Sequence, residues 1–152
     1  PQPTVLAAGS DHVMTFTAEL DGDARLFATE VVVLGRHGEE PGRVRSRWDV
    51  RVDGVELLVQ ELDLGEGAPP GWRGPAVTAG ARVIVMAIAV DPDWDEEACL
   101  RAAGPSVAGE VLDLAGGGIL LTTLVDSAVA AEREVTAFAE RVRLVGQEST
   151  AR

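Results

Sequence analysis

One run of strand-forming residues, Leu26–Arg36, constrains this chain more than any other segment. β-Branched and aromatic residues fill the run and Gly35 interrupts it near its end, as expected for a strand. Alternation gives the strand two apolar faces, so we expect it to be covered on both sides. Glu30 is the exception, because it lies mid-strand with no other charge within three residues. A buried carboxylate without a partner costs several kcal/mol, so Glu30 is the first candidate for a function.

The overall composition limits the class of protein. A length of 152 residues fits one domain, and a hydrophobic content of 46% argues against disorder. No apolar run approaches the roughly 20 residues needed to cross a bilayer, and without a basic segment followed by an apolar one we do not expect secretion. Cys99 is the only cysteine, so we expect no internal disulfide and a cytoplasmic location. The net charge of −12, without any lysine, disfavours nucleic acid and membrane surfaces as partners.

The first half of the chain predicts a β-meander. In His12–Leu20, mostly apolar residues alternate with mostly polar ones, as in a half-buried strand. The turn at Asp21–Asp23 should return the chain, so that Leu26–Arg36 pairs with this strand in an antiparallel hairpin. In Arg43–Asp53, apolar residues alternate with arginines and acids. One face of that strand is predicted to be core, and the other to meet solvent or another protein.

Asp53-Gly54 predicts a tight hairpin turn that leads into a return strand, Val55–Leu64. The apolar residues of the return strand change parity, which predicts a β-bulge near Leu58–Glu61. Such a bulge would re-aim Gln60 or Glu61. The simple register predicts the cross-strand pairs Arg51–Glu56 and Arg47–Gln60.

The second half of the chain has a different pattern. Gly65–Gly80 is a long loop rich in proline and glycine, and loops of this length are often functional or wrap a neighbour. The whole pattern predicts an α+β fold, mainly β, that ends in a strand–helix–strand–strand–helix unit. The expected elements of that unit are the strand Ala81–Val90, a helix from Asp91 to Gly104, the strands Val107–Leu114 and Ile119–Val125, and a helix from Ala128 to about Val145.

Motifs for catalysis or for a tightly bound cofactor are missing. Neither GxGxxG nor GxxxxGK[ST] occurs, and the glycines at 116–118 lie between two predicted strands, not before a helix. His12, His37 and Cys99 do not have the spacing of a zinc site. A hydrolase that used Glu30 as a base would need a second acid or a nucleophile beside it, and none is visible. We therefore expect a protein that is not an enzyme.

Several segments, taken in order, resemble the urease accessory protein UreD (UreH) family. The resemblance covers essentially the whole chain but only the C-terminal part of the family, whose N-terminal portion, with a Gly-Gly-Asp motif and the first strands, is absent. It implies one domain over residues 1–152, built as a two-layer, helicoidal β-sheet scaffold with a few helices. The segments are Pro1–Gly9, Glu30–Arg36, Arg47–Gly54, Leu57–Val59, Leu62–Leu64 and the C-terminal strand–helix–strand–strand–helix unit.

The resemblance also implies partners and a cargo. UreD-like proteins bind apo-urease and UreF, and through UreF they recruit the GTPase UreG, which supplies nickel. Nickel is implied to cross the interior through a water-filled passage lined by acidic and polar groups. Glu30 keeps the acid that the family has before Val-Val-Val-Leu-Gly-Arg. Where the family commonly has a second acid, this chain has Gln60 followed by Glu61, so either residue could line the path.

The residue types suit transit of nickel better than storage. Carboxylate oxygens spaced along a hydrated channel hold Ni²⁺ weakly, whereas a cage of His and Cys would trap it. We expect a urease-maturation scaffold in which Glu30, with Gln60 or Glu61, lines the path and no cofactor is tightly bound. The alternative is a protein-interaction module in which Glu30 forms an internal ion pair. Without the N-terminal strands, sheet edges and apolar faces should remain open.

Overall fold

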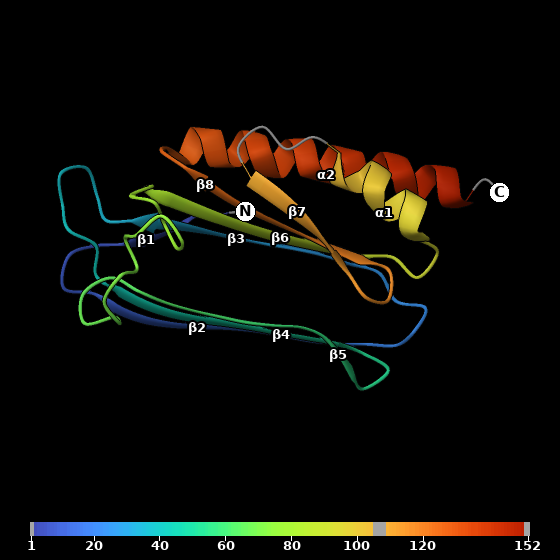
Figure 1. Ribbon diagram of the computed structural model, residues 1–152, viewed down its shortest axis with the longest axis horizontal. Coiled ribbons are helices and arrows are strands. Elements are labelled where there is room, and N and C mark those ends of the chain that lie inside the picture. The colour runs from blue at the N-terminus through green and yellow to red at the C-terminus, as the bar shows by residue number, and fades with distance from the viewer. Residues whose placement is uncertain (1, 105–108, 151–152) are drawn as a thin grey trace.

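Two β-sheets and a pair of helices form three stacked layers (Figure 1). The computed structural model describes residues 2–104 and 109–150. The helices cover one face of a five-stranded sheet, and a three-stranded sheet covers its other face (Figure 1). The predicted class, α+β and mainly β, is confirmed. The elements are β1 (Thr4–Leu6), β2 (Asp11–Leu20), β3 (Leu26–Leu34), β4 (Arg43–Val52), β5 (Val55–Leu64), β6 (Val83–Val90), α1 (Glu96–Ala103), β7 (Gly109–Leu114), β8 (Gly118–Val125) and α2 (Ala128–Thr150).

The strand β3 lies inside the stack because both of its faces are apolar. In the five-stranded sheet, whose order is β1-β3-β6-β8-β7, it pairs in parallel with β1 and antiparallel with β6. Val31 packs on the helix side with Val135 of α2. Val32 packs on the other side with Val44 of the three-stranded sheet. The predicted cover on both faces is confirmed.

The predicted antiparallel hairpin between β2 and β3 is wrong. β2 belongs to the three-stranded sheet, whose order is β2-β4-β5, and it pairs with β4 in parallel. The reason lies in the different burial patterns of β2 and β3. β2 has one polar face, with Thr15, Thr17 and Glu19 exposed, which suits an outer sheet. β3 needs cover on both faces, so residues 21–25 carry the chain from one sheet to the other.

The predicted hairpin between β4 and β5 is confirmed. Asp53 and Gly54 have positive φ angles of 50° and 75°, as a type I′ turn requires. Arg51 lies opposite Glu56, as predicted, and donates to Glu56 Oε1 at 2.9 Å.

The predicted β-bulge in this hairpin is confirmed. The register shifts at Leu57, directly before the range Leu58–Glu61 near which the bulge was expected. Leu57 and Leu58 both pack against the apolar cluster between the sheets, so the extra residue is accommodated there. As a result Glu61, and not Gln60, lies opposite Arg47.

The charged face of β4 points outward, and its arginines form ion pairs with acids of the same sheet. Arg47 and Arg51 donate to Asp49, and these contacts hold the pKa of that carboxyl below its usual range. Arg43 lowers the pKa of Asp63 in the same way, through two hydrogen bonds of 3.0 and 2.8 Å. The predicted division of β4 into a core face and a charged face is confirmed.

The long loop Gly65–Gly80 packs on its own chain. Trp72 lies against the cluster between the sheets that contains Leu34 and Val44. The N–H and the hydroxyl of Thr78 both donate to the Trp72 carbonyl, at 3.2 and 2.8 Å, and fasten the loop.

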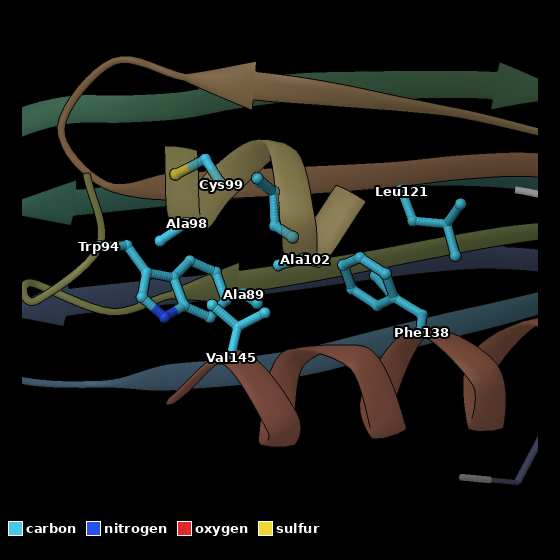
Figure 2. Close-up of a cluster of buried hydrophobic side chains, with 10 residues drawn as sticks. Ala89, Trp94, Ala98, Cys99, Ala102, Leu121, Phe138 and Val145 are labelled. Carbon is cyan, nitrogen blue, oxygen red and sulfur yellow. The ribbon is translucent and has the colours of Figure 1, made fainter. Parts of the chain in front are cut away.

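A second core lies between the two helices and the five-stranded sheet (Figure 2). Phe138 of α2 and Cys99 of α1 are buried there. Burial, together with nearby Asp113, raises the pKa of the Cys99 thiol to about 11. The other labelled side chains of this core are Ala89, Trp94, Ala98, Ala102, Leu121 and Val145.

The helix boundaries differ from the predicted ones. The helix expected from Asp91 begins at Glu96, because Asp95 caps it by accepting a 2.8 Å hydrogen bond from the N–H of Ala98. The start of the strand predicted for Val107–Leu114 lies outside the described residues. α2 begins at Ala128 as predicted but continues to Thr150. No helix in the described ranges is long and apolar enough to span a membrane.

Candidate functional site

Glu30 lies in the middle of β3 and faces the space between the two sheets. It is opposite Met86 of β6, and Met86 packs against Trp48 of the three-stranded sheet. Directly opposed residues of a sheet share a face, so Glu30 points toward the three-stranded sheet as Met86 does. The acid singled out by the sequence is therefore an inward-facing, half-buried residue.

Two neutral donors of β4 hold the Glu30 carboxylate. The Ser46 hydroxyl lies 3.0 Å from each carboxylate oxygen, and Trp48 Nε1 donates to Oε2 at 3.2 Å. Both donors are buried, with 4% and 2% of their surface exposed. They are two residues apart in β4, so the period of the strand places both on the face that looks at β3.

The alternative prediction, an internal ion pair at Glu30, is not what the structure contains. Within residues 2–104 and 109–150, the carboxylate has Ser46 and Trp48 as partners and no arginine. Neutral donors stabilise an ionised carboxylate without cancelling its charge. Glu30 can therefore still attract a cation.

Gln60 of β5 lies opposite Trp48 and faces the same inter-sheet space. It lines a cavity of about 550 Å³ whose walls come from β5 on one sheet, from β6, β7 and β8 on the other, and from residues 75–77 of the long loop. Met86 is also in that wall. Because Met86 is the cross-strand neighbour of Glu30, it lies between the acid and the part of the cavity formed by β8.

Glu61 points away from this space. It lies on the outer face of the three-stranded sheet, where it forms an ion pair with Arg47, and its side chain is 66% exposed. The bulge at Leu57 sets this orientation, since it fixes which residue of β5 is opposite Arg47. Of the two candidates for a second lining residue, the structure thus places Gln60 on the same side as Glu30 and Glu61 on the opposite side.

A further acid, Glu110 of β7, was missed by the sequence reasoning. It lies opposite Thr122 of β8, which lies opposite Met86, which lies opposite Glu30. The four residues form one row across the sheet, and Glu110, Thr122 and Met86 all line the inter-sheet cavity. The alternation within β7 divides its side chains between the two faces. Only the order of the strands could have revealed that Glu110 shares a face with Glu30.

The arrangement does not form a closed metal site. In the described part of the chain, no three His, Cys, Asp or Glu side chains are grouped so that they could hold a metal ion. What the structure offers is one inward carboxylate held by neutral donors, with a partly polar cavity beyond Met86.

Comparison with known proteins identifies the family. The model of the UreD urease accessory protein family matches residues 1–152. The chain belongs to the UreD family. UreD of Streptomyces coelicolor A3(2) is 41% identical to this chain over 133 residues, which cover 88% of this chain and 52% of that protein. UreD of Streptomyces avermitilis is 40% identical over 134 residues, with the same two coverages.

A UreD protein from another genus also matches this chain. UreD of Frankia alni is 38% identical over 156 residues, which cover 92% of this chain and 51% of that protein. The chain therefore spans about half the length of these UreD relatives.

Proposed function

We propose that this chain is part of a non-enzymatic scaffold for urease maturation, and that Glu30 lines a path by which nickel travels toward apo-urease. The observation that carries the proposal is the Glu30 carboxylate, which faces the space between two sheets and is held only by Ser46 and Trp48 among the described residues. Its negative charge is therefore free to interact with a passing cation.

The surroundings of Glu30 suit an ion that must leave again. Ni²⁺ is held weakly by a single carboxylate oxygen, and groups of three potential ligands are not found within the described ranges. Gln60, Thr122 and Glu110 line the neighbouring cavity and supply further oxygen atoms. An interior of this kind favours transit over storage.

The family supports the wider role. UreD proteins are named as urease accessory proteins, so the partners we propose are apo-urease, UreF and, through UreF, the GTPase UreG, all in the cytoplasm. The outer face of the three-stranded sheet has its arginines paired internally, which gives no support to binding of nucleic acid or of an anionic membrane.

The test is urease activation at limiting nickel, in a strain of Streptomyces coelicolor that lacks its own UreD. The protein supplied is a chimera in which this chain replaces the matching part of the S. coelicolor UreD. Glu30→Gln keeps the size of the side chain and removes its charge, and we expect it to lower activation at least fivefold. Glu61→Gln is the matched control on the outer face, and we expect it to behave as the parent chimera does.

Binding of the chimera to UreF is measured alongside activation. The proposal requires that Glu30→Gln bind UreF normally. Activation equal to that of the parent chimera at limiting nickel would remove the role of Glu30 in transit.

A further inference from the structure

The strand that carries Glu30 is paired along only part of one edge. β1 pairs with the last three residues of β3, Val32 to Leu34, whereas β6 pairs with Leu26 to Val33 on the other side. Within the described part of the chain, residues 26–31 therefore have no strand on the edge that β1 occupies farther along. An unpaired edge of this length is a template for another strand.

The direction of the free backbone groups follows from a single hydrogen bond. The N–H of Leu34 donates to the carbonyl of Arg82, next to β6, at 2.8 Å. Since the backbone groups of successive residues in a strand point to opposite edges, even-numbered residues of β3 point toward β6. The N–H and C=O groups of Phe27 and Thr29 consequently point to the open edge.

Apolar side chains beside this edge are also uncovered. Phe27 of β3 and Val5 of β1 are each 43% exposed, and Val129 of α2 is 59% exposed. A hollow of about 610 Å³ lies at the start of β3, lined by residues that include Phe27 and Val142. A second hollow of about 280 Å³, lined by Val31 and Val129 among others, lies toward β1. Exposed apolar side chains next to free backbone groups mark a place where further chain is to be added.

We propose that this edge of β3 receives an extended segment from the half of a UreD polypeptide that these 152 residues do not represent. The UreD relatives are about twice as long as the part that matches this chain, so a segment of suitable length exists in such proteins. β2 also lies at the edge of its sheet, and among the described residues its one strand partner is β4. Residues 7–10 connect β1 directly to β2, so the open edges of both sheets lie on one side of the stack and can be covered together.

The added strand bears directly on Glu30. A residue paired with Glu30 across this edge shares its face of the sheet, with the two Cβ atoms about 4.5–5.5 Å apart. The residue of the added strand opposite Glu30 is then its nearest new neighbour on that face of the sheet, whereas Glu61 faces outward. This consequence rests on the proposed nickel path, whereas the pairing itself does not.

Hydrogen exchange measured by NMR tests the pairing without reference to nickel. The samples are the 152-residue chain and the full-length chimera described above. We expect the amide protons of Phe27 and Thr29 to exchange rapidly in the 152-residue chain. In the chimera they should exchange on the order of 100-fold more slowly, because a paired strand exchanges only when the sheet opens. Slow exchange at both positions in a monomeric 152-residue chain, or equally fast exchange in the two proteins, would overturn the proposal.

A proline substitution provides the second measurement. Thr29→Pro removes an N–H that points to the open edge, which an edge strand tolerates, so the 152-residue chain should keep its unfolding midpoint within a few degrees. The chimera should lose the slow exchange at Phe27. Thr29→Ala, which keeps the N–H, should leave exchange in the chimera unchanged. Equal loss of stability in both proteins would mean local strain and would count against the added strand.

A second copy of the chain is the competing occupant. Size-exclusion chromatography with light scattering measures its contribution in the same samples. A stable dimer of the 152-residue chain with slow exchange at Phe27 and Thr29 would assign the edge to self-association. The chimera can also pass the exchange test and still show no effect of Glu30→Gln on urease activation, so the two proposals can fail separately.

Discussion

Trp48 of one sheet donates its indole N–H to the Glu30 carboxylate of the other sheet, at 3.2 Å. This contact joins the two layers at the only acid in β3, and it is made by a side chain with 2% of its surface exposed. Trp48 also packs against Phe16, with 4.8 Å between the ring centroids. The tryptophan is thus both a core residue and a partner of the candidate site.

Trp48→Phe should destabilise the chain in a way that depends on Glu30. Hydrogen bonds to charged groups contribute about 1.5–3 kcal/mol, and the smaller ring adds a loss of packing. A double-mutant cycle with Glu30→Ala, measured by urea unfolding, separates the two terms. We expect a coupling free energy of at least about 1 kcal/mol. Strictly additive effects would mean that the indole N–H does not stabilise the carboxylate.

Glu110→Gln should lower urease activation in the chimera at limiting nickel, by less than Glu30→Gln does. Glu110 lines the cavity but is exposed and lies at the edge of the sheet, so water can replace part of its interaction with a cation. Glu61→Gln is again the matched control. Normal activation by Glu110→Gln together with impaired activation by Glu30→Gln would place the path elsewhere than this cavity.

Asp63 should make the stability of the chain depend on pH in the acidic range. Its pKa in the folded chain is lowered by Arg43, below the value of about 3.9 for an unfolded aspartate. The stabilisation is therefore complete above pH ~4 and is lost as pH falls through the lower, folded pKa. Urea unfolding between pH 6 and 3 should show a shallower decline for Asp63→Asn than for the parent chain. Asp23→Asn, in the exposed turn before β3, serves as the control and should retain the parent slope.

Cys99 should be unreactive in the folded chain. A thiol with a pKa of about 11 is ionised in about one molecule per thousand at pH 8, and only the thiolate attacks a disulfide reagent. Native protein should therefore react with Ellman's reagent far more slowly than protein in concentrated urea. Rapid reaction without denaturant would show that α1 opens readily around this residue.

Gly65 should tolerate alanine far less than Gly38 does. Both have positive φ, 96° and 76°, but a Cβ on Gly65 would lie 1.9 Å from the Gly42 carbonyl oxygen, and one on Gly38 would meet open space. We expect Gly38→Ala to cost about 1–2 kcal/mol of unfolding free energy, from backbone conformation alone. Gly65→Ala should exceed about 3 kcal/mol, because the end of β5 must move away from the start of β4. Similar costs at the two positions would show that this end of the hairpin adjusts easily.

Local sequence patterns predicted the positions of strands and helices better than they predicted which strands pair. The two apolar faces around Val31 and Val32 correctly indicated a strand covered on both sides. Nothing in that pattern says that β3 pairs with β6, because any apolar strand satisfies the same requirement. The Asp53-Gly54 turn was predictable because two adjacent residues determine its conformation.

The site was predictable only in part, for a similar reason. Glu30 stood out because a charge in an apolar strand is anomalous at the level of sequence. The choice between Gln60 and Glu61 depended on a one-residue shift of register, and a shift of that size reverses every side chain. The bulge at Leu57, which packs between the sheets, sets Gln60 facing inward and Glu61 facing outward. Glu110 needed the strand order of the whole sheet.

The path of the chain between the two sheets has a kinetic consequence. β1, β3 and β6 lie in one sheet while β2, β4 and β5 lie in the other, so the polypeptide crosses between the layers four times before β6 ends. Neither layer can be assembled from a contiguous stretch, and the parallel pair β2–β4 joins residues 32 positions apart. Such distant pairings close slowly. Glu30 and its partner Met86 are 56 positions apart, so during synthesis β3 remains without β6 until that many further residues have left the ribosome.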